Sequence, residues 1–243
     1  MSRLRRLMVV LALLVAAAGG FAGWLAHIGY FGGPVFFEIP AKPGTSAQGA
    51  VAVLLSGDLG FRIGMGPRIA DRLAADGIPV IGVSSLAYFR TQRTPADAQA
   101  LLAKAARRAL AFGHGDRLIL IGQSFGADML HVGLTRLPAD LRGKVQMVAL
   151  VVPTDTVFFR ASPGELFNWA RPDAAALPTA RALTWVPTVC IRGVDEADSL
   201  CPALTQPNVR GVALPGGHAL HHDIDALYAA LRREILATAP RAT

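Results

Sequence analysis

The most constraining feature of this chain is a serine placed between two glycines, where an apolar run gives way to a helical pattern. Residues 118–121 suit a buried strand, and Gly122-Gln123-Ser124-Phe125-Gly126 follows them directly. A strand that turns at once into a helix brings backbone close to backbone, so residues without a β-carbon are needed around the turn. In this context the motif predicts a nucleophile elbow that holds the Ser124 hydroxyl clear of the sheet.

Strand-like and helix-like stretches alternate along the chain after residue 49. The apolar strand patterns cover residues 51–55, 79–83, 117–121, 145–152, 188–191 and 209–214. The helical patterns cover residues 64–75, 94–112, 124–136 and 223–236. Such alternation predicts a parallel sheet with helices on both faces. Together with the elbow, it predicts the α/β class and an α/β-hydrolase fold with a mostly parallel central sheet and no large lid domain.

The first 28 residues form a separate segment. Three arginines within residues 3–6 precede an almost unbroken apolar stretch over residues 7–26, and about 20 apolar residues can cross a bilayer as a helix. The arginines would stay in the cytoplasm while the rest is exported to the periplasm. Ala16-Ala17-Ala18 also fits a cleavage site, so an uncleaved inner-membrane anchor and a removed signal peptide both stay open.

The rest of the chain divides by composition. Residues 29–49 are rich in glycine, proline and small residues, which indicates a linker with a possible edge strand. Residues 50–238 are then expected to form the hydrolase domain and residues 239–243 a tail.

The charge pattern argues against a nucleic-acid partner. The formal net charge of +7 falls to +4 when the three arginines near the amino terminus are left out, and the remaining arginines are scattered. A nucleic-acid surface would show a basic stripe with interleaved aromatic residues. We therefore expect no nucleic-acid partner, and only a mild attraction to an anionic membrane surface.

A histidine that can serve the nucleophile follows the last predicted strand. In hydrolases of this architecture the acid and the histidine follow the serine in chain order, on loops after later strands. Pro215-Gly216-Gly217-His218 forms such a loop, and its glycines allow the imidazole to reach over the elbow. His218 is expected to accept the Ser124 proton and to return it to the leaving group.

The acid is left open between two carboxylates on the loop after the strand at 188–191. Glu196 has the usual spacing from the glycine that ends this strand, and Asp198 lies farther along the loop. Cys190 and Cys201 flank the same loop, and export favours a disulfide between them over two buried thiols. Two cysteines without a neighbouring pair of histidines make a metal site improbable, and the expected chemistry needs no cofactor.

The oxyanion of the reaction needs hydrogen-bond donors. The backbone N–H of Phe125 is the first candidate, because it follows the nucleophile. A second donor is expected from the loop after the strand at 51–55, from Asp58 or Leu59, although ordinary strand-to-helix turns also use such residues.

Five motifs in order resemble the VirJ/AcvB family of bacterial virulence proteins. They are Ser56-Gly57-Asp58, Tyr88-Phe89 with Arg93-Thr94-Pro95, Gly122-Gln123-Ser124-Phe125-Gly126-Ala127-Asp128, Glu196-Ala197-Asp198-Ser199-Leu200-Cys201 and Pro215-Gly216-Gly217-His218. The resemblance spans about residues 50–236 and implies an exported α/β-hydrolase-fold protein. Members of the AcvB type hydrolyse aminoacylated phosphatidylglycerol, and VirJ is associated with type IV secretion.

The resemblance implies a serine hydrolase that removes lysine or alanine from aminoacyl-phosphatidylglycerol. The inner membrane and this lipid are then the expected partners, and Asp58, Asp128 or Asp155 is expected to pair with the substrate amine. Two alternatives stay open: a general carboxylesterase or thioesterase, and a non-catalytic accessory protein of type IV secretion that contacts secretion-system proteins.

Overall fold

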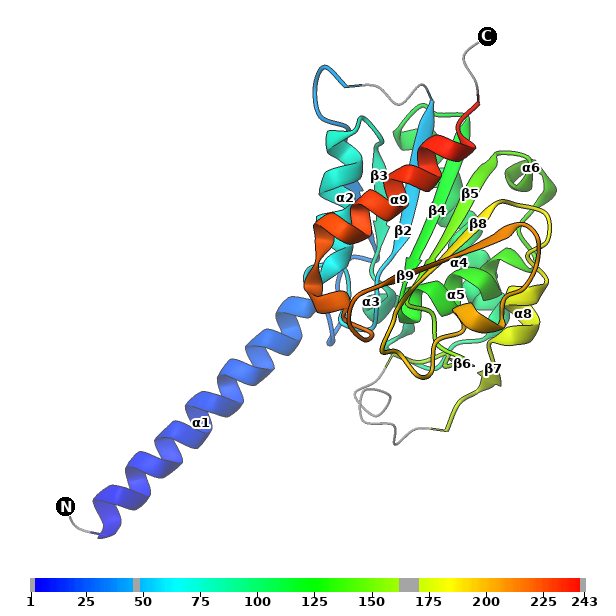
Figure 1. Ribbon diagram of the computed structural model, residues 1–243. Helices are drawn as coiled ribbons and strands as arrows, with labels where there is room; N and C mark the ends of the chain where they lie inside the picture. Colours follow the sequence, from blue (N-terminus) through cyan, green and yellow to red (C-terminus); the bar gives the residue numbers. More distant parts are fainter. Residues whose placement is uncertain (1–2, 46–48, 162–170, 241–243) are drawn as a thin grey trace.

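A computed structural model of the chain describes residues 3–45, 49–161 and 171–240 (Figure 1). Its centre is a seven-stranded sheet, and two further short strands form a separate pair. The strands are β1 (Phe36–Ile39), β2 (Ala50–Leu55), β3 (Val80–Val83), β4 (Arg117–Gln123), β5 (Val145–Val151), β6 (Thr156–Val157), β7 (Ala174–Ala175), β8 (Thr188–Gly193) and β9 (Val209–Leu214).

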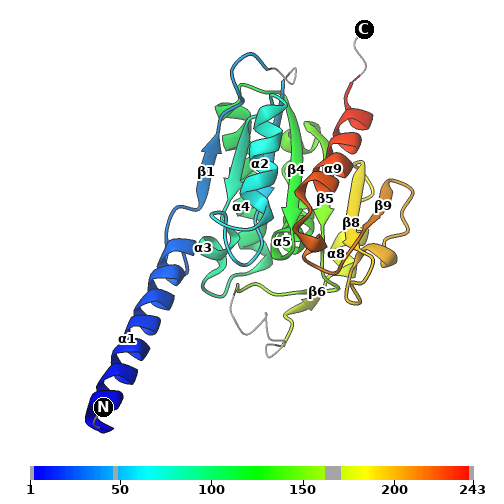
Figure 2. The ribbon, with the colours of Figure 1, turned by 60° about the vertical axis from the view of Figure 1, so that its left-hand side comes forward.

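The main sheet has the order β1-β3-β2-β4-β5-β8-β9. The strands β3, β2, β4, β5, β8 and β9 pair in parallel, and β1 pairs antiparallel with β3 at one edge. The loops that follow β2, β4, β8 and β9 therefore leave the sheet at the same end. This end, where α3 and β6 also lie in Figures 1 and 2, is called the catalytic edge below.

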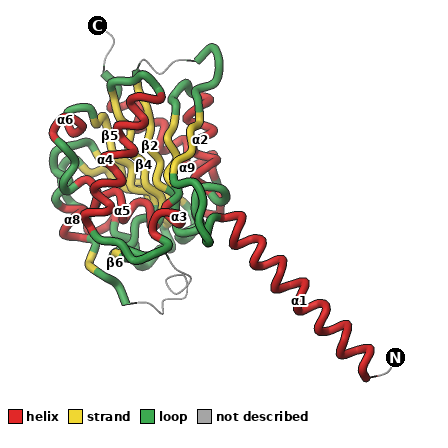
Figure 3. The backbone as a smooth tube through the Cα atoms, turned by 180° about the vertical axis from the view of Figure 1, so that it is seen from behind, coloured by secondary structure: helices red, strands yellow, loops and turns green. Residues whose placement is uncertain are grey.

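Helices cover both faces of the sheet. The helices of the domain are α2 (Met65–Ala75), α3 (Ser85–Phe89), α4 (Pro95–Phe112), α5 (Phe125–Leu134), α6 (Ala139–Arg142), α8 (Leu177–Arg181) and α9 (Ile224–Thr238), with 3-10 turns at Cys201–Ala203 and Leu220–His222. Helices α2 and α9 pack on one face, and α4, α5 and α8 cover the other (Figure 3).

Successive residues of a central strand serve the two cores in turn. In β2, Val51, Val53 and Leu55 belong to the cluster under α4 and α5, whereas Ala52 and Leu54 belong to the cluster under α2 and α9. This is the two-residue period of a strand that is buried on both faces. It explains why the strand reads as an unbroken apolar run in the sequence.

The start of α4 has a capping box. The Thr94 hydroxyl accepts from the backbone N–H of Asp97 at 3.3 Å, and the Asp97 carboxylate accepts from the Thr94 N–H at 2.9 Å. Pro95 occupies the first helical position, where its missing N–H costs no helical hydrogen bond. The sequence shows no helical periodicity over the short helix α3. The Ser84 hydroxyl caps the start of α3 by accepting a hydrogen bond from the Ala87 N–H.

The expected fold is confirmed, and no separate lid domain occurs among the described residues. Besides α8, the described parts of the chain between β5 and β8 contain only the short pair β6–β7. The catalytic edge is therefore shaped mainly by the loops of the sheet itself.

Helix α1 (Arg3–Ile28) projects away from the domain (Figures 1 and 2). Its most apolar stretch of 18 residues has a mean hydropathy of 2.2 and is not buried by the rest of the protein. Among the described residues it is the one helix with the length and composition to cross a membrane. These properties fit both an anchor and a signal sequence.

Candidate active site

The predicted elbow is present, with Ser124 as the single residue between β4 and α5. Its φ of 54° and ψ of −129° place a non-glycine residue in a conformation that only a well-determined surrounding maintains. A β-carbon on Gly122 would lie 2.4 Å from the Gly126 carbonyl oxygen, and one on Gly126 would lie 2.4 Å from the Leu55 carbonyl oxygen. Both glycines are therefore required by the close backbone approach.

Three side chains form a hydrogen-bonded row at the elbow. Ser124 Oγ lies 2.7 Å from His218 Nε2, and His218 Nδ1 lies 2.5 Å from Glu196 Oε1. With the Nδ1 proton directed to the carboxylate, Nε2 is free to accept the serine proton. The row has the geometry of a Ser-His-acid triad, and its serine and histidine come from the predicted positions.

Of the two candidate acids, only Glu196 contacts the histidine. The Glu196 side chain is 1 % exposed, and its second oxygen accepts from the Gly193 N–H at 3.3 Å. The Asp198 side chain is exposed. The backbone carbonyl of Asp198 accepts a hydrogen bond from the Asp155 N–H at 2.9 Å. Of the two acids that the sequence left open, the structure therefore places Glu196 and not Asp198 against His218.

Opposing effects act on the imidazole. Desolvation by burial lowers the pKa of His218, but the hydrogen bond and charge of Glu196, with the charges of Asp198 and Asp58, raise this pKa above 6.5. The carboxylates thus stabilise the imidazolium that forms when the serine proton is transferred.

The loops that carry the acid and the histidine hold each other. The N–H of Asp195 donates to the Gly216 carbonyl at 3.1 Å, and a β-carbon on Gly193 would lie 2.3 Å from the same oxygen. Leu220–His222, which follow the histidine, all have positive φ. This close packing and backbone strain fix His218 relative to Glu196.

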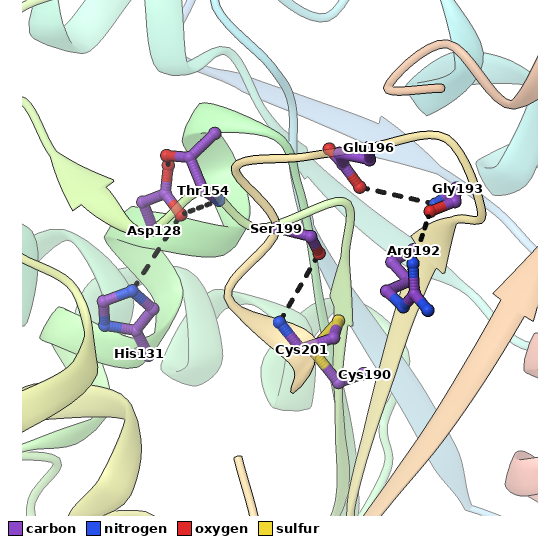
Figure 4. Close-up of a disulfide and its surroundings, with 9 residues drawn as sticks. All are labelled: Asp128, His131, Thr154, Cys190, Arg192, Gly193, Glu196, Ser199 and Cys201. Atoms are coloured by element: carbon purple, nitrogen blue, oxygen red, sulfur yellow. Dashed lines mark hydrogen bonds and ion pairs between the residues drawn. A yellow bond between two sulfur atoms is a disulfide. The ribbon is translucent and has the colours of Figure 1, made fainter. Parts of the chain in front are cut away.

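A disulfide closes the acid-bearing loop (Figure 4). Cys190 in β8 is bonded to Cys201 at the start of the 3-10 turn, with a sequence separation of 11. Thr154 and Ser199 form an antiparallel bridge beside it, and the Leu200 N–H donates to the Pro153 carbonyl at 3.0 Å. The predicted cysteine pairing is confirmed, and the bond holds the segment that contains Glu196.

Removing this disulfide is expected to lower the free energy of unfolding by about 3 kcal/mol, because the loop entropy of the unfolded chain is no longer restricted. Guanidinium denaturation of Cys190→Ala/Cys201→Ala, beside wild type and reduced wild type, measures this loss. The reduced wild type controls for the small cavities that alanine leaves. Equal midpoints for the oxidised and the reduced wild type would contradict the prediction.

The loop after β2 lies beside the nucleophile. A β-carbon on Gly57 would be 3.5 Å from the Ser124 β-carbon. Ser85 holds this loop from the start of α3, because its N–H donates to the Ser56 hydroxyl at 3.1 Å and its hydroxyl donates to the Ser56 carbonyl at 2.6 Å. The sequence analysis did not identify Ser85, whose only signal is its position directly after a strand.

The elbow offers one free donor for an oxyanion, and the loop after β2 carries two further candidates. Phe125 is the first residue of α5, so its N–H has no acceptor within the helix. The N–H groups of Asp58 and Leu59 face the Asp58 carboxylate, where they lower its pKa against the larger rise that burial causes. These two N–H groups can therefore serve an oxyanion only when that carboxylate turns away.

Asp58 and His218 interact electrostatically, because the charge of Asp58 raises the pKa of His218 and the charge of His218 lowers that of Asp58. Asp58 is half-buried, and no salt bridge joins it to another described residue. A negative charge at this place opposes a nearby oxyanion. A cationic group bound here would find an acidic partner in Asp58.

Asp128 does not face the site, so the expectation that it binds the substrate is wrong. Asp128 is 4 % exposed, and its two oxygens accept from the Thr154 N–H at 3.1 Å and hydroxyl at 2.9 Å (Figure 4). Burial raises its pKa well above 3.8. His131 Nε2 lies 3.9 Å from Asp128 Oδ1. The His131 side chain is fully buried, and this burial lowers its pKa to about 3.

The buried Asp128 instead supports the acid-bearing loop through Thr154. The same threonine bridges to Ser199, so a chain of contacts runs from the first turn of α5 to the segment after Glu196. Sequence reasoning missed Thr154, because its only signal is its position just after β5. No group of three or more His, Cys, Asp and Glu that could hold a metal occurs in the described part of the chain.

Comparisons with known proteins match the chain to a family and to a fold. The family model described as "Bacterial virulence protein (VirJ)" matches residues 49–241. No curated protein gives a significant sequence match.

Solved structures give significant matches to the fold. Est1E from Butyrivibrio proteoclasticus has a TM-score of 0.62 and 11 % identity, with 84 % of this chain and 93 % of that chain covered. XC6422 from Xanthomonas campestris, described as an α/β serine hydrolase without lid, has a TM-score of 0.59 and 17 % identity, with 87 % and 94 % covered. Naproxen esterase from Bacillus subtilis has a TM-score of 0.54 and 13 % identity, with 82 % and 86 % covered. At these identities the likeness shows the α/β-hydrolase fold.

Proposed function

Because this chain belongs to the VirJ family of bacterial virulence proteins, we propose that it is a membrane-anchored periplasmic serine hydrolase that cleaves the aminoacyl ester of aminoacyl-phosphatidylglycerol. The observation that carries the hydrolase proposal is the row of Ser124, His218 and Glu196, with contacts of 2.7 Å and 2.5 Å. The resemblance to AcvB-type hydrolases and the apolar helix α1 support the lipid substrate.

The proposed reaction has two steps. Ser124 Oγ attacks the ester carbonyl carbon while His218 Nε2 takes its proton, and the Phe125 N–H stabilises the oxyanion. The bond from the carbonyl carbon to the glycerol oxygen then breaks, and His218 protonates this oxygen, which releases phosphatidylglycerol. In the second step His218 takes a proton from water, the hydroxide attacks the aminoacyl-Ser124 ester, and the free amino acid leaves with Ser124 restored.

Asp58 is the group proposed to select aminoacyl esters. The α-ammonium of such an ester lies next to the reacting carbonyl, so it can pair with the Asp58 carboxylate while the carbonyl oxygen points to the Phe125 N–H. The pairing would neutralise the charge that opposes the oxyanion. It would also draw the carboxylate off the N–H groups of Asp58 and Leu59, which then become further donors.

Asp58→Asn is expected to lower the preference for alanine p-nitrophenyl ester over propionate p-nitrophenyl ester by about 30-fold, the usual cost of removing one partner from a desolvated ion pair. The two esters differ in the ammonium group alone, and the ratio of their kcat/KM values is the measurement. Asp195→Asn, an exposed acid on the neighbouring loop, is the matched control and should leave the ratio unchanged. An unchanged ratio in Asp58→Asn would refute the assignment.

The function itself is tested on lipid. The full chain is incubated with lysyl- and alanyl-phosphatidylglycerol in vesicles, and release of the free amino acid is followed beside turnover of p-nitrophenyl butyrate. Release from the lipid is the expected result. Turnover of the soluble ester alone would favour a general carboxylesterase, the activity named for some structural neighbours. A folded protein that reacts with neither ester nor fluorophosphonate would be a non-catalytic accessory protein.

A further inference from the structure

The carboxyl-terminal end of α1 is built into the hydrolase domain instead of being joined to it by a free linker. Ile28 is 3 % exposed and belongs to the main core, and Leu25 and Tyr30 pack against the same core. The Tyr30 N–H donates to the Leu25 carbonyl at 2.9 Å. A β-carbon on Gly60 would lie 2.8 Å from the Ile28 carbonyl oxygen, so the helix end touches the loop beside Ser124.

The aromatic residues near this helix end mark the level of a bilayer surface. Trp24 is 42 % exposed and stacks on Phe21 with ring centroids 5.9 Å apart. Tryptophan and tyrosine concentrate at membrane–water interfaces. At about 1.5 Å per residue, Trp24 precedes the buried Ile28 by only about 6 Å along the helix axis. With α1 in a bilayer, the domain begins at the level of the lipid headgroups.

The catalytic edge presents exposed cations beside this helix end. Three exposed arginines lie in the segments that follow these elements: Arg62 after β2, Arg90 after α3 and Arg160 after β6. The loops of the last two are tied together, since the Ala161 N–H donates to the Phe89 carbonyl at 2.9 Å. Within residues 3–45, 49–161 and 171–240, none of the three arginines forms a salt bridge, and the Arg62 guanidinium lies over the Phe37 ring, 5.8 Å from its centroid.

The direction of α1 relative to the sheet agrees with these positions. In Figures 1 and 2, α1 leaves the domain at the edge where α3 and β6 lie, and α6 and the carboxyl terminus are at the opposite end in Figure 1. Because the buried end of α1 fixes this direction, a bilayer that holds α1 faces the catalytic edge and not the amino-terminal ends of the strands.

We infer that the catalytic edge rests on an anionic phospholipid surface, held there by the packed end of α1 and by Arg62, Arg90 and Arg160. This inference rests on the proposed function for its membrane setting. Each arginine near such a surface strengthens attraction about fivefold at physiological ionic strength. The arrangement brings Ser124 to esters at headgroup level, so the lipid need not be extracted from the bilayer.

Hydrogen exchange on the full chain in nanodiscs tests the inference without using activity. Phosphatidylcholine discs are compared with discs of phosphatidylcholine and phosphatidylglycerol. In the anionic discs, amides in residues 57–63 and 88–93 are expected to exchange at least about tenfold more slowly, as three added cation contacts predict. The variant Arg62→Glu/Arg90→Glu/Arg160→Glu should lose this protection.

The matched control is Arg136→Glu/Lys144→Glu/Arg233→Glu, three exposed cations outside the catalytic edge, and it should keep the protection. Equal protection in wild type and in the catalytic-edge variant, or none in wild type, would overturn the inference. Turnover of p-nitrophenyl butyrate by the same preparations reports the hydrolase proposal separately. If that turnover is absent while the lipid-dependent protection is present, the docking surface stands and the hydrolase proposal fails.

Discussion

Replacement of Ser124 by alanine is expected to lower kcat/KM for p-nitrophenyl butyrate by on the order of 10⁶, because the covalent route is lost and only binding and oxyanion contacts remain. The hydroxyl at the elbow lies 2.7 Å from its proton acceptor. The substitution removes one oxygen atom. Alanine and serine both carry a β-carbon, so the φ of 54° strains the backbone equally in the two proteins. Folding is therefore expected to stay close to that of the wild type.

Ser199→Ala is the matched control for this substitution. Ser199 lies on the acid-bearing loop, and among the described residues its hydroxyl makes one long hydrogen bond, accepting from the Cys201 N–H at 3.4 Å. It should keep nearly full turnover and full labelling by a fluorophosphonate probe, whereas Ser124→Ala should lose both. Labelling that persists in Ser124→Ala would assign the nucleophile to another residue.

The elbow and the histidine were predictable from the sequence because local chemistry determines them. Glycines are needed on both sides of Ser124 because a β-carbon at either position would lie 2.4 Å from a backbone carbonyl oxygen, and such a need shows directly as residue type. The central strands β2, β3 and β4 were equally clear, since they are buried on both faces and read as apolar runs. His218 follows from chain order and from the two glycines before it.

The partners that act across the fold were less accessible. Glu196 and Asp198 are both carboxylates on one loop, and the choice between them depends on how that loop packs against Gly216. Asp128 looked available because it sits in the first turn after the elbow. Its side chain is instead buried against Thr154, a contact between α5 and the segment after β5 that no local pattern reveals.

The packed end of α1 shows the same limit. Residues 29–49 read as a linker with a possible edge strand, and β1 is that strand, but no residue pattern indicated that Ile28 lies in the core. A helix that is apolar all round gives no sign of which residue leaves the lipid and enters the domain. This contact gives α1 a fixed direction relative to the catalytic edge.

Glu196→Gln is expected to lower kcat/KM by on the order of 10⁴, as loss of the acid does in other Ser-His-acid hydrolases. An amide can offer its N–H₂ to His218 Nδ1 and so favour the wrong tautomer, and it no longer stabilises the imidazolium. Asp198→Asn should keep kcat/KM within about fivefold at high pH, because Asp198 does not touch the imidazole and His218 is neutral there in both proteins.

The pH profile separates the two acids further. His218 must be neutral to accept the serine proton, so kcat/KM should rise with pH through the pKa of His218, which the surrounding carboxylates hold above 6.5. Removing the Asp198 charge lowers this pKa, so the rise should move to lower pH while the plateau is kept. A profile of Asp198→Asn with an unmoved limb and a plateau as low as that of Glu196→Gln would reverse the assignment of the acid.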